Sequence, residues 1–179
     1  PTPRQRGFDK FFGTLTGAGS FWNPRTLMED QTLIQPDSPD FYYTDAISDH
    51  AIEMISSNAD SEKPFFLYLA YTSPHWPLHA FEEDIAEYEG VYDQGYAPIR
   101  AARLQRAVEL GVLQDKWSMS PGRDWEKTKN KAWEIRSMEA YAAMVDRMDR
   151  GIGQIVGELK RQQAFDNTIV IYLQDNGGC

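Results

Sequence analysis

The feature that most constrains the fold is an unbroken apolar run from Phe65 to Tyr71, with Pro64 before it and Pro74 soon after it. A run of this length, rich in aromatic residues and bounded by prolines, predicts a strand buried on both faces of a sheet. The strand leads into His75, which stands between two prolines in the sequence PHWP. Because ligands bind just beyond the carboxyl ends of strands in open α/β sheets, His75 is a candidate site residue.

The end of the chain repeats this arrangement. Thr168 to Leu173, TIVIYL, predicts a second strand of the buried type, and it leads into Asp175, Asn176 and two glycines. We predict that the two strands are neighbours or near neighbours in one sheet and point the same way, because both end in polar residues of one candidate site. His75 and the Asp175–Asn176 pair would then face the same cleft.

Helical periodicity predicts four helices around these strands, and a short strand at Phe8–Phe12 precedes them. Thr44 is a good N-cap for the first helix. The predicted helices are Asp45–Ser57, Glu82–Tyr88, Gln94–Leu110, and a long one from Asp124 or Thr128 to about Gln162. The order helix, strand, long insertion, helix, strand fits a layered α/β domain.

The longest predicted helix carries an apolar stripe with alternating steps of three and four residues. Its members are Met138, Tyr141, Val145, Met148, Ile152, Ile155 and Leu159. We expect this stripe to pack on the predicted sheet. Three glycines, Gly151, Gly153 and Gly157, argue against a long free coiled coil and indicate a close approach to the neighbouring element.

Size and composition are those of one globular domain with a core: 179 residues, 41% hydrophobic and 25% charged. The formal net charge of −9 argues against a nucleic-acid partner. No apolar run approaches the roughly 20 residues of a membrane span. Cys179 is the single cysteine, which excludes an internal disulfide. The chain begins at Pro1 rather than Met, so we expect a preceding segment, and the compartment stays open.

His75 and His79 lie four residues apart, a spacing that forms a zinc-binding face on a helix. Pro77 lies between them and argues against a continuous helix. His75 is the better candidate, either as a general acid or as a contact to an anion. A loop histidine bonded to the backbone is the alternative interpretation.

Asp175 and Asn176 offer two adjacent oxygen-bearing side chains, and the glycines behind them allow a tight turn. Oxygen ligands suit a hard cation such as calcium or magnesium. A plain Asp-Asn-Gly turn is the alternative, and these residues suit it equally well. Because calcium takes about 6–8 oxygen ligands, any metal site here needs further carboxylates from elsewhere.

Short motifs spread over nearly the whole chain carry further information through their order and spacing. They are Gly7–Asp9, Phe12-Gly13, Gly17–Ser20, Tyr43–Asp45 with Ala51, Pro64–Tyr71, Pro74–Pro77, Tyr92-Asp93 with Gly95, Ile99-Arg100, Tyr141–Val145, Met148-Asp149, Gly151–Gly153 and Asp175–Gly178. Together they resemble the type I sulfatases, specifically the arylsulfatase A-like group of the alkaline phosphatase superfamily. The resemblance implies a layered α/β/α sandwich with a mostly parallel mixed sheet, incomplete in this chain.

The resemblance also implies hydrolysis of a sulfate ester at a site with one calcium ion. In the family, the histidine before x-Pro that follows this strand contacts the substrate sulfate, and His75 holds that position as a substrate-binding and catalytic residue. The family's calcium ligands in the Asp-Asn-Gly block fall on Asp175 and Asn176. A calcium ion would polarise the sulfate, and a positioned histidine would neutralise or protonate developing charge.

The family's nucleophile is missing from these residues. It is a formylglycine made from Cys or Ser in a Cys/Ser-x-Pro-x-Arg motif, which Ser73-Pro74-His75 does not match, and Cys179 belongs to the Asp-Asn-Gly-Gly-Cys block. The paired aspartates and the lysines of the family site are missing too. We therefore expect residues 1–179 to be the central part of a single sulfatase catalytic domain, with the formylglycine outside it and no turnover from this piece alone.

Two other functions stay open. One is a phosphodiesterase or phosphonate hydrolase of the same superfamily, and the other is a non-catalytic homologue that binds sulfated glycans. The expected substrate is a small-molecule or glycan sulfate ester, with no nucleic acid and no membrane span. The family implies a periplasmic, extracellular or lysosome-like location, and the oligomeric state stays open.

Overall fold

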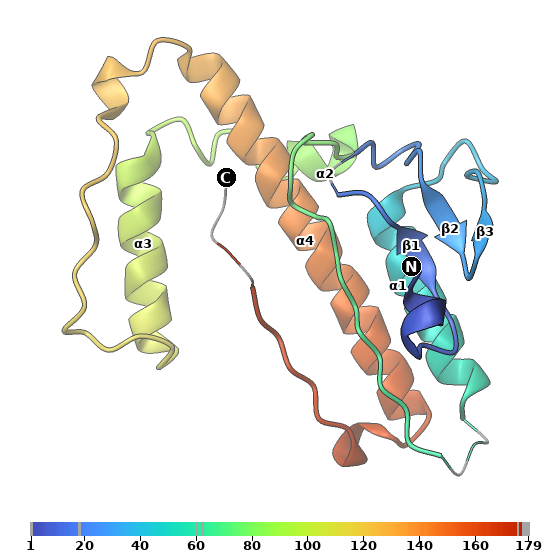
Figure 1. Ribbon diagram of the computed structural model, residues 1–179. Helices are drawn as coiled ribbons and strands as arrows, with labels where there is room; N and C mark the ends of the chain where they lie inside the picture. Colours follow the sequence, from blue (N-terminus) through green and yellow to red (C-terminus); the bar gives the residue numbers. More distant parts are fainter. Residues whose placement is uncertain (1, 18, 60, 62, 175, 177–179) are drawn as a thin grey trace. The chain divides into compact units, whose positions relative to one another are not determined.

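The structure is a computed structural model, which describes residues 2–17, 19–59, 61, 63–174 and 176. The chain forms two compact units, one of residues 1–79 and 144–179 and one of residues 80–143. The short described strands lie together near the start of the chain, and the α-helices follow them (Figure 1). In order, these are a 3₁₀ helix Pro3–Arg6, β1 Phe12–Thr14, β2 Leu27–Glu29, β3 Thr32–Leu33, α1 Tyr43–Ser57, α2 Glu82–Ala86, α3 Tyr96–Glu109, a 3₁₀ helix Trp125–Lys127, α4 Lys131–Arg161 and a 3₁₀ helix Phe165–Asn167.

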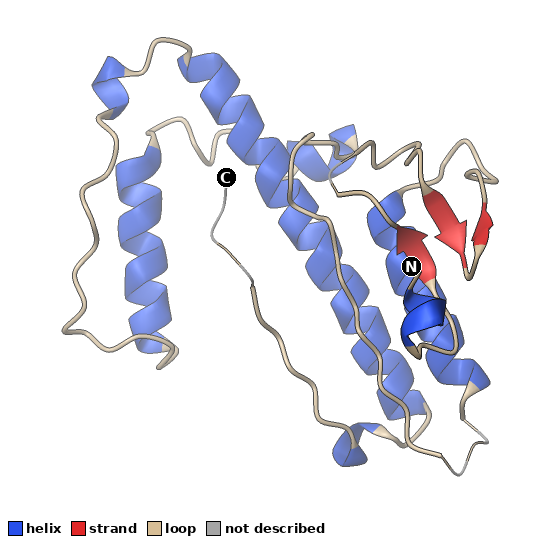
Figure 2. Cartoon of the chain, viewed as in Figure 1, coloured by secondary structure: helices blue, strands red, loops and turns tan. Residues whose placement is uncertain are grey.

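The described strands form one small antiparallel sheet in the order β1-β2-β3, drawn as red arrows in Figure 2. Phe12 pairs with Glu29, and Met28 pairs with Leu33. Asp30 turns the chain between β2 and β3 with a positive φ of 54°, and its side chain accepts a hydrogen bond from the Phe11 backbone N–H at 2.9 Å. The sequence predicted a short strand near β1 but missed β2 and β3.

Helices α1 and α4 form the core of the first unit. Ala51 and Ile55 of α1 form a buried cluster with Ile155 and Leu159 of α4. Gly151 permits close packing, because a Cβ at this position would clash with the Ser48 side chain, whose own Cβ would be only 3.1 Å away. The prediction of a close approach is thus confirmed at Gly151. Gly153 and Gly157 have nothing within 4 Å of such a Cβ.

The long helix is confirmed, but its buried face differs slightly from the predicted stripe. The buried residues of the helix include Ala140, Ala143, Met144, Met148, Gly151, Ile155 and Leu159. Val145 and Ile152 of the predicted stripe are half-buried. Met148, Ile155 and Leu159 are thus buried as predicted, whereas Met144 and Gly151 are buried in place of the next residues, and the partner in the cluster is α1 rather than a sheet.

Neither of the two predicted buried strands is a strand in the structure. Residues 65–71 and 168–173 form no ladder with any other described residues. Both run upward in the view of Figure 1, without being paired. The prediction of two strands paired in one sheet is therefore wrong for the described part of the chain.

The side chains of the first of these segments still alternate as they would in a strand. Leu67 and Leu69 pack against the α1–α4 cluster, whereas Phe66 and Tyr68 are 78% and 71% exposed. One face is therefore buried on helices, and the other lacks the second layer that the apolar sequence predicted. A strand needs a neighbour to satisfy its backbone groups, and the described residues supply none here.

The predicted start of the first helix is wrong. Thr44 lies inside α1 and is buried, with Tyr42 as the N-cap, so Thr44 does not cap the helix. In the second unit, α3 buries none of its residues and ends at Glu109, with Leu110 as its C-cap just before Gly111, close to the predicted end. Among the described helices, none has both the length and the apolar sequence needed to cross a bilayer.

Candidate functional site

His75 lies in the turn that directly follows the extended segment ending at Tyr71. We call residues Ser73–His79 the histidine turn. The backbone turns at the start of this segment, where the His75 N–H donates a hydrogen bond to the Thr72 carbonyl at 2.9 Å. The peptide bonds before Pro74 and Pro77 are both cis. The His75 side chain is exposed, so it is accessible to a ligand.

A backbone contact fixes the proton on the His75 ring. Nδ1 lies 2.8 Å from the carbonyl oxygen of Trp76. A carbonyl only accepts hydrogen bonds, so Nδ1 must donate and carries the proton. In the neutral ring, Nε2 then holds the lone pair, and in the protonated ring it becomes a donor. The backbone bond is thus present, and it orients the ring rather than excluding a functional role.

Ser73 holds the first end of the histidine turn to α4. Its buried hydroxyl donates to the Met144 carbonyl at 3.1 Å. Just before the turn, the Tyr71 hydroxyl lies 2.7 Å from the Ser48 hydroxyl of α1. Burial raises the pKa of Tyr71 despite its bond to Ser48. The entry to the turn is therefore attached to both helices of the core.

His79 holds the other end of the turn, a role that sequence analysis did not assign. The Phe21 backbone N–H donates to His79 Nδ1 at 3.3 Å, and the Tyr42 hydroxyl donates to the His79 carbonyl at 2.7 Å. The rings of Phe21 and Trp22 lie 6.1 and 6.3 Å from the imidazole. Burial lowers the pKa of His79, which favours the neutral ring.

The two histidines do not form a metal-binding pair on a helix. The segment between them is not helical, as Pro77 indicated. Both Nδ1 atoms are engaged by backbone groups, with opposite roles: that of His75 donates and that of His79 accepts. The only sequence feature that pointed to this arrangement was the spacing of the two histidines. Nothing in the sequence around Phe21 or Tyr42 indicated that these residues contact His79.

A partly exposed ion pair links α1 to α4 near Tyr42. Arg147 donates to both carboxylate oxygens of Asp45, with distances between 2.7 and 3.0 Å. The guanidinium also lies 5.5 Å from the centre of the Tyr42 ring. The charge of Arg147 is thus compensated by Asp45, so its role here is to join the helices.

The predicted calcium ligands can be followed only in part. Asp175 lies outside the described residues, and Asn176 is exposed. Within the described ranges, no three or more His, Cys, Asp or Glu side chains are grouped so that they could hold a metal ion. Because calcium takes about 6–8 oxygens, the described residues do not form a calcium site by themselves. The shared cleft of His75 and Asp175–Asn176 stays a prediction.

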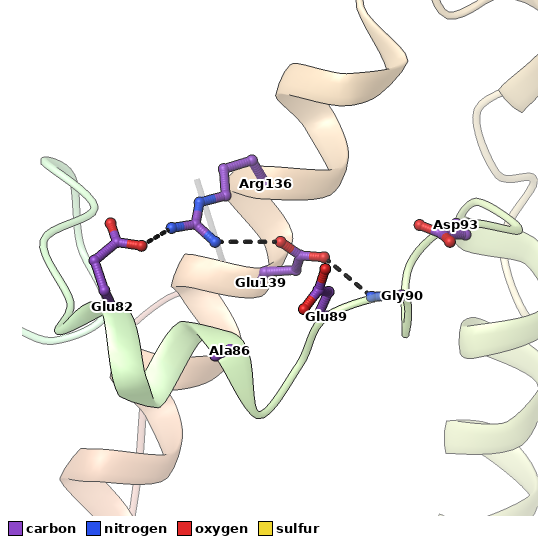
Figure 3. Close-up of a pocket in the computed structure, with 7 residues that line it drawn as sticks. All are labelled: Glu82, Ala86, Glu89, Gly90, Asp93, Arg136 and Glu139. Atoms are coloured by element: carbon purple, nitrogen blue, oxygen red, sulfur yellow. Dashed lines mark hydrogen bonds and ion pairs between the residues drawn. The ribbon is translucent and has the colours of Figure 1, made fainter.

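A pocket in the second unit contains none of the predicted site residues. Its volume is about 460 Å³, and its lining residues are Glu82, Ala86, Glu89, Gly90, Asp93, Arg136 and Glu139. Figure 3 shows Arg136 between two carboxylates, with ion pairs to Glu82 and to Glu139, and Glu139 accepts a hydrogen bond from the Gly90 N–H. Four carboxylates against one compensated arginine make this pocket unsuitable for a sulfate anion.

The sequence matches the family model described as Sulfatase over residues 1–178. It is 32% identical to an uncharacterized sulfatase of Schizosaccharomyces pombe and 31% identical to an arylsulfatase of Klebsiella aerogenes, each over 98% of this chain. The chain spans 35% and 41% of the length of these two relatives.

Two solved structures have the same fold. One is Ps i-CgsB in complex with k-i-k-neocarrahexaose, with a TM-score of 0.61 and 24% identity, and the other is yidJ of Bacteroides fragilis, with a TM-score of 0.64 and 18% identity. Each match covers 93% of this chain and 32% of the solved chain. The α/β fold, with its small antiparallel sheet, is that of alkaline phosphatase-like sulfatases. The chain belongs to the sulfatase family, as a type I sulfatase of the alkaline phosphatase superfamily.

Proposed function

We propose that the protein containing this chain is a sulfuric ester hydrolase of the arylsulfatase type. Family membership supports the reaction class, and the geometry of His75 supports the site. His75 is exposed in a turn attached at both ends, and its Nδ1–H bond to Trp76 directs Nε2 away from that carbonyl. This fixed tautomer is the single observation that carries the assignment.

In this proposal His75 binds the sulfate group and neutralises negative charge that develops on it. The protonated ring donates a hydrogen bond from Nε2 to a sulfate oxygen, and the proton can pass to an oxygen that gains charge as the ester bond breaks. The Trp76 carbonyl keeps the Nδ1 proton in place through both states. A histidine suits this task because its imidazole Nε2 can both donate and accept a proton.

The remaining parts of the site belong to the proposal as well. Asp175 and Asn176 would hold one calcium ion together with ligands from outside this chain, and calcium, when bound, polarises the sulfate. The nucleophile would be a formylglycine outside residues 1–179, which would make this chain the central part of one catalytic domain. The alternative of a phosphodiesterase or phosphonate hydrolase has no observation in its favour here.

The substrate class is proposed as a small-molecule or glycan sulfate ester, in an exported or lysosome-like compartment. A structural relative has been solved with a neocarrahexaose, which supports the glycan option by analogy. Neither the acidic pocket near Arg136 nor the net charge of −9 supports a further surface for binding an extended anionic ligand in the described residues.

The proposal is tested with His75→Ala in the full-length protein. Rates are measured with p-nitrophenyl sulfate and with bis-p-nitrophenyl phosphate. We expect the sulfatase kcat/KM to fall by about 10²–10⁴-fold, the range for loss of a general acid. His50→Gln is the matched control, because His50 of α1 stacks on Phe12 with ring centres 3.6 Å apart and lies outside the turn. Wild-type sulfatase rates in His75→Ala, or a phosphodiesterase rate above the sulfatase rate, would reject the proposal.

A further inference from the structure

We propose that His79 is a positioning residue for His75: it fastens the second end of the histidine turn through its ring and its carbonyl at once. The inference rests on the proposed function of His75. It assigns to His79 no contact with substrate. Its effect on the reaction passes through the place and orientation of the His75 ring.

The histidine turn has one anchor on each side of His75. On the N-terminal side, the buried hydroxyl of Ser73 donates to the Met144 carbonyl. On the C-terminal side, His79 is the residue that holds the turn. Its carbonyl accepts from the Tyr42 hydroxyl at 2.7 Å, and its Nδ1 accepts from the Phe21 N–H at 3.3 Å. The two partners of His79 come from two different places in the sequence, so His79 joins three segments.

The chemistry of the His79 ring fits an anchor better than a second acid or base. A backbone N–H only donates, so Nδ1 of His79 must be unprotonated to accept it. A proton on Nδ1 would remove this bond, and the partly buried position beside Phe21, Trp22 and Tyr42 disfavours the charged ring. His79 is therefore held as the neutral Nε2–H tautomer, the opposite of His75.

His79 lies close to His75 in the sequence, so a change at His79 can reach the His75 ring through few residues. His79 follows His75 by four residues, and Trp76, which lies between them, provides the carbonyl that orients His75. If the C-terminal anchor is lost, the Trp76 carbonyl and the His75 ring can shift together. A displacement of about 1 Å at a reacting group can cost about 10²-fold in rate.

Three variants of the full-length protein separate this role from a general loss of stability. His79→Phe keeps an aromatic ring next to Phe21 and Trp22 but removes the acceptor for the Phe21 N–H. His79→Gln can restore an acceptor through its side-chain amide oxygen. Tyr42→Phe removes only the hydroxyl that binds the His79 carbonyl, and it keeps the ring under Arg147. It serves as the second test if His79→Phe does not fold.

The measurements are kcat and KM for p-nitrophenyl sulfate, with His50→Gln as the control histidine. We expect kcat to fall about 10- to 100-fold in His79→Phe and by a smaller factor in Tyr42→Phe. His79→Gln should recover most of the wild-type kcat. In the His75→Ala background, adding His79→Phe should cause no further loss, because both changes act on the same group.

Each outcome decides between the two proposals. Wild-type kcat in folded His79→Phe, or in Tyr42→Phe if that variant alone folds, overturns the positioning role. So do losses that multiply in His75→Ala/His79→Phe, because they show that His79 acts independently of His75. If His75→Ala itself leaves the rate unchanged, the proposed function fails first, and the role of His79 fails with it. If His75→Ala causes a large loss and the His79 variants have no effect, the proposed function is retained and the positioning role of His79 is rejected.

Discussion

Gly151 shows at the scale of one residue how α4 lies against α1. The position faces the Ser48 side chain, and a Cβ there would also lie 3.3 Å from the Tyr71 hydroxyl. Ser48 is fully buried, donates its one hydroxyl hydrogen to the Thr44 carbonyl at 3.1 Å, and accepts from the Tyr71 hydroxyl at 2.7 Å. A methyl group at residue 151 must therefore disturb this hydrogen-bonded group.

Two glycine substitutions on the same helix should have opposite effects on stability. Gly151→Ala should lower the free energy of unfolding by about 1–3 kcal/mol, the usual cost of overpacking. Gly153→Ala should raise it by about 0.5–1 kcal/mol, because alanine favours the helix and nothing lies within 4 Å of its Cβ. Urea denaturation of the full-length protein measures both. Equal destabilisation by the two changes would contradict the close approach at Gly151.

Residue by residue, the sequence predicted the place of His75 but not what holds it there. Proline on both sides and the end of an apolar run were local signals, and the structure has His75 in a turn at that point. The anchors of His79 involve Phe21 and Tyr42, which are 58 and 37 residues away in the chain. Contacts at such separations follow from packing, and no local pattern of residue types reveals them.

At the scale of elements, Glu158 joins the C-terminal part of α4 to the end of α1. Its carboxylate accepts from Arg161 at 2.6 and 2.7 Å, from Ser56 at 2.6 Å and from Gln162 at 2.8 Å. These hydrogen bonds, first those of Arg161 and then those of Ser56 and Gln162, lower the pKa of Glu158 to about 2. The charged form is therefore favoured in the folded protein.

The lowered pKa predicts how stability changes with acid. A carboxyl group with a folded pKa of about 2 and an ordinary value of 4.5 stabilises the fold above its ordinary pKa, and this contribution is lost as the pH falls toward 2. Glu158→Gln should thus lower the melting temperature at pH 7, and the difference from wild type should shrink between pH 5 and pH 2. Glu109→Gln is the control, because its 3.4 Å pair with Arg106 is exposed. A difference that does not change with pH would contradict this account.

Helices were predictable from the sequence, whereas among the described strands only β1 was approximately predicted. The periodic apolar residues of α1 and α4 recur at helical spacing, so their existence and their approximate ends followed from local pattern. The hairpin of β2 and β3 has only three and two residues and carries no alternation long enough to detect. The apolar runs at 65–71 and 168–173 were interpreted as paired strands, but pairing depends on neighbours that the pattern of one segment does not contain.

At the scale of the whole molecule, the described residues leave much apolar surface uncovered. Ile169, Ile171 and Leu173 are 89%, 75% and 71% exposed, and the outer face of residues 65–71 is exposed as well. Scattered exposed apolar residues are ordinary, but two extended apolar segments with unpaired backbones are typical of sheet edges that aggregate. This agrees with the proposal that the chain is the central part of a larger catalytic domain.

The last prediction concerns residues 1–179 produced alone. We expect no hydrolysis of p-nitrophenyl sulfate, because the sequence contains no Cys/Ser-x-Pro-x-Arg motif from which a formylglycine could be made. We also expect no tight calcium binding in calorimetry, because only Asp175 and Asn176 are assigned as ligands. The exposed segments should bind a hydrophobic dye and promote aggregation. The full-length protein, measured in the same assays, should hydrolyse the ester, bind calcium and stay monodisperse. Turnover by residues 1–179 that His75→Ala abolishes would show that this chain contains a nucleophile of another kind.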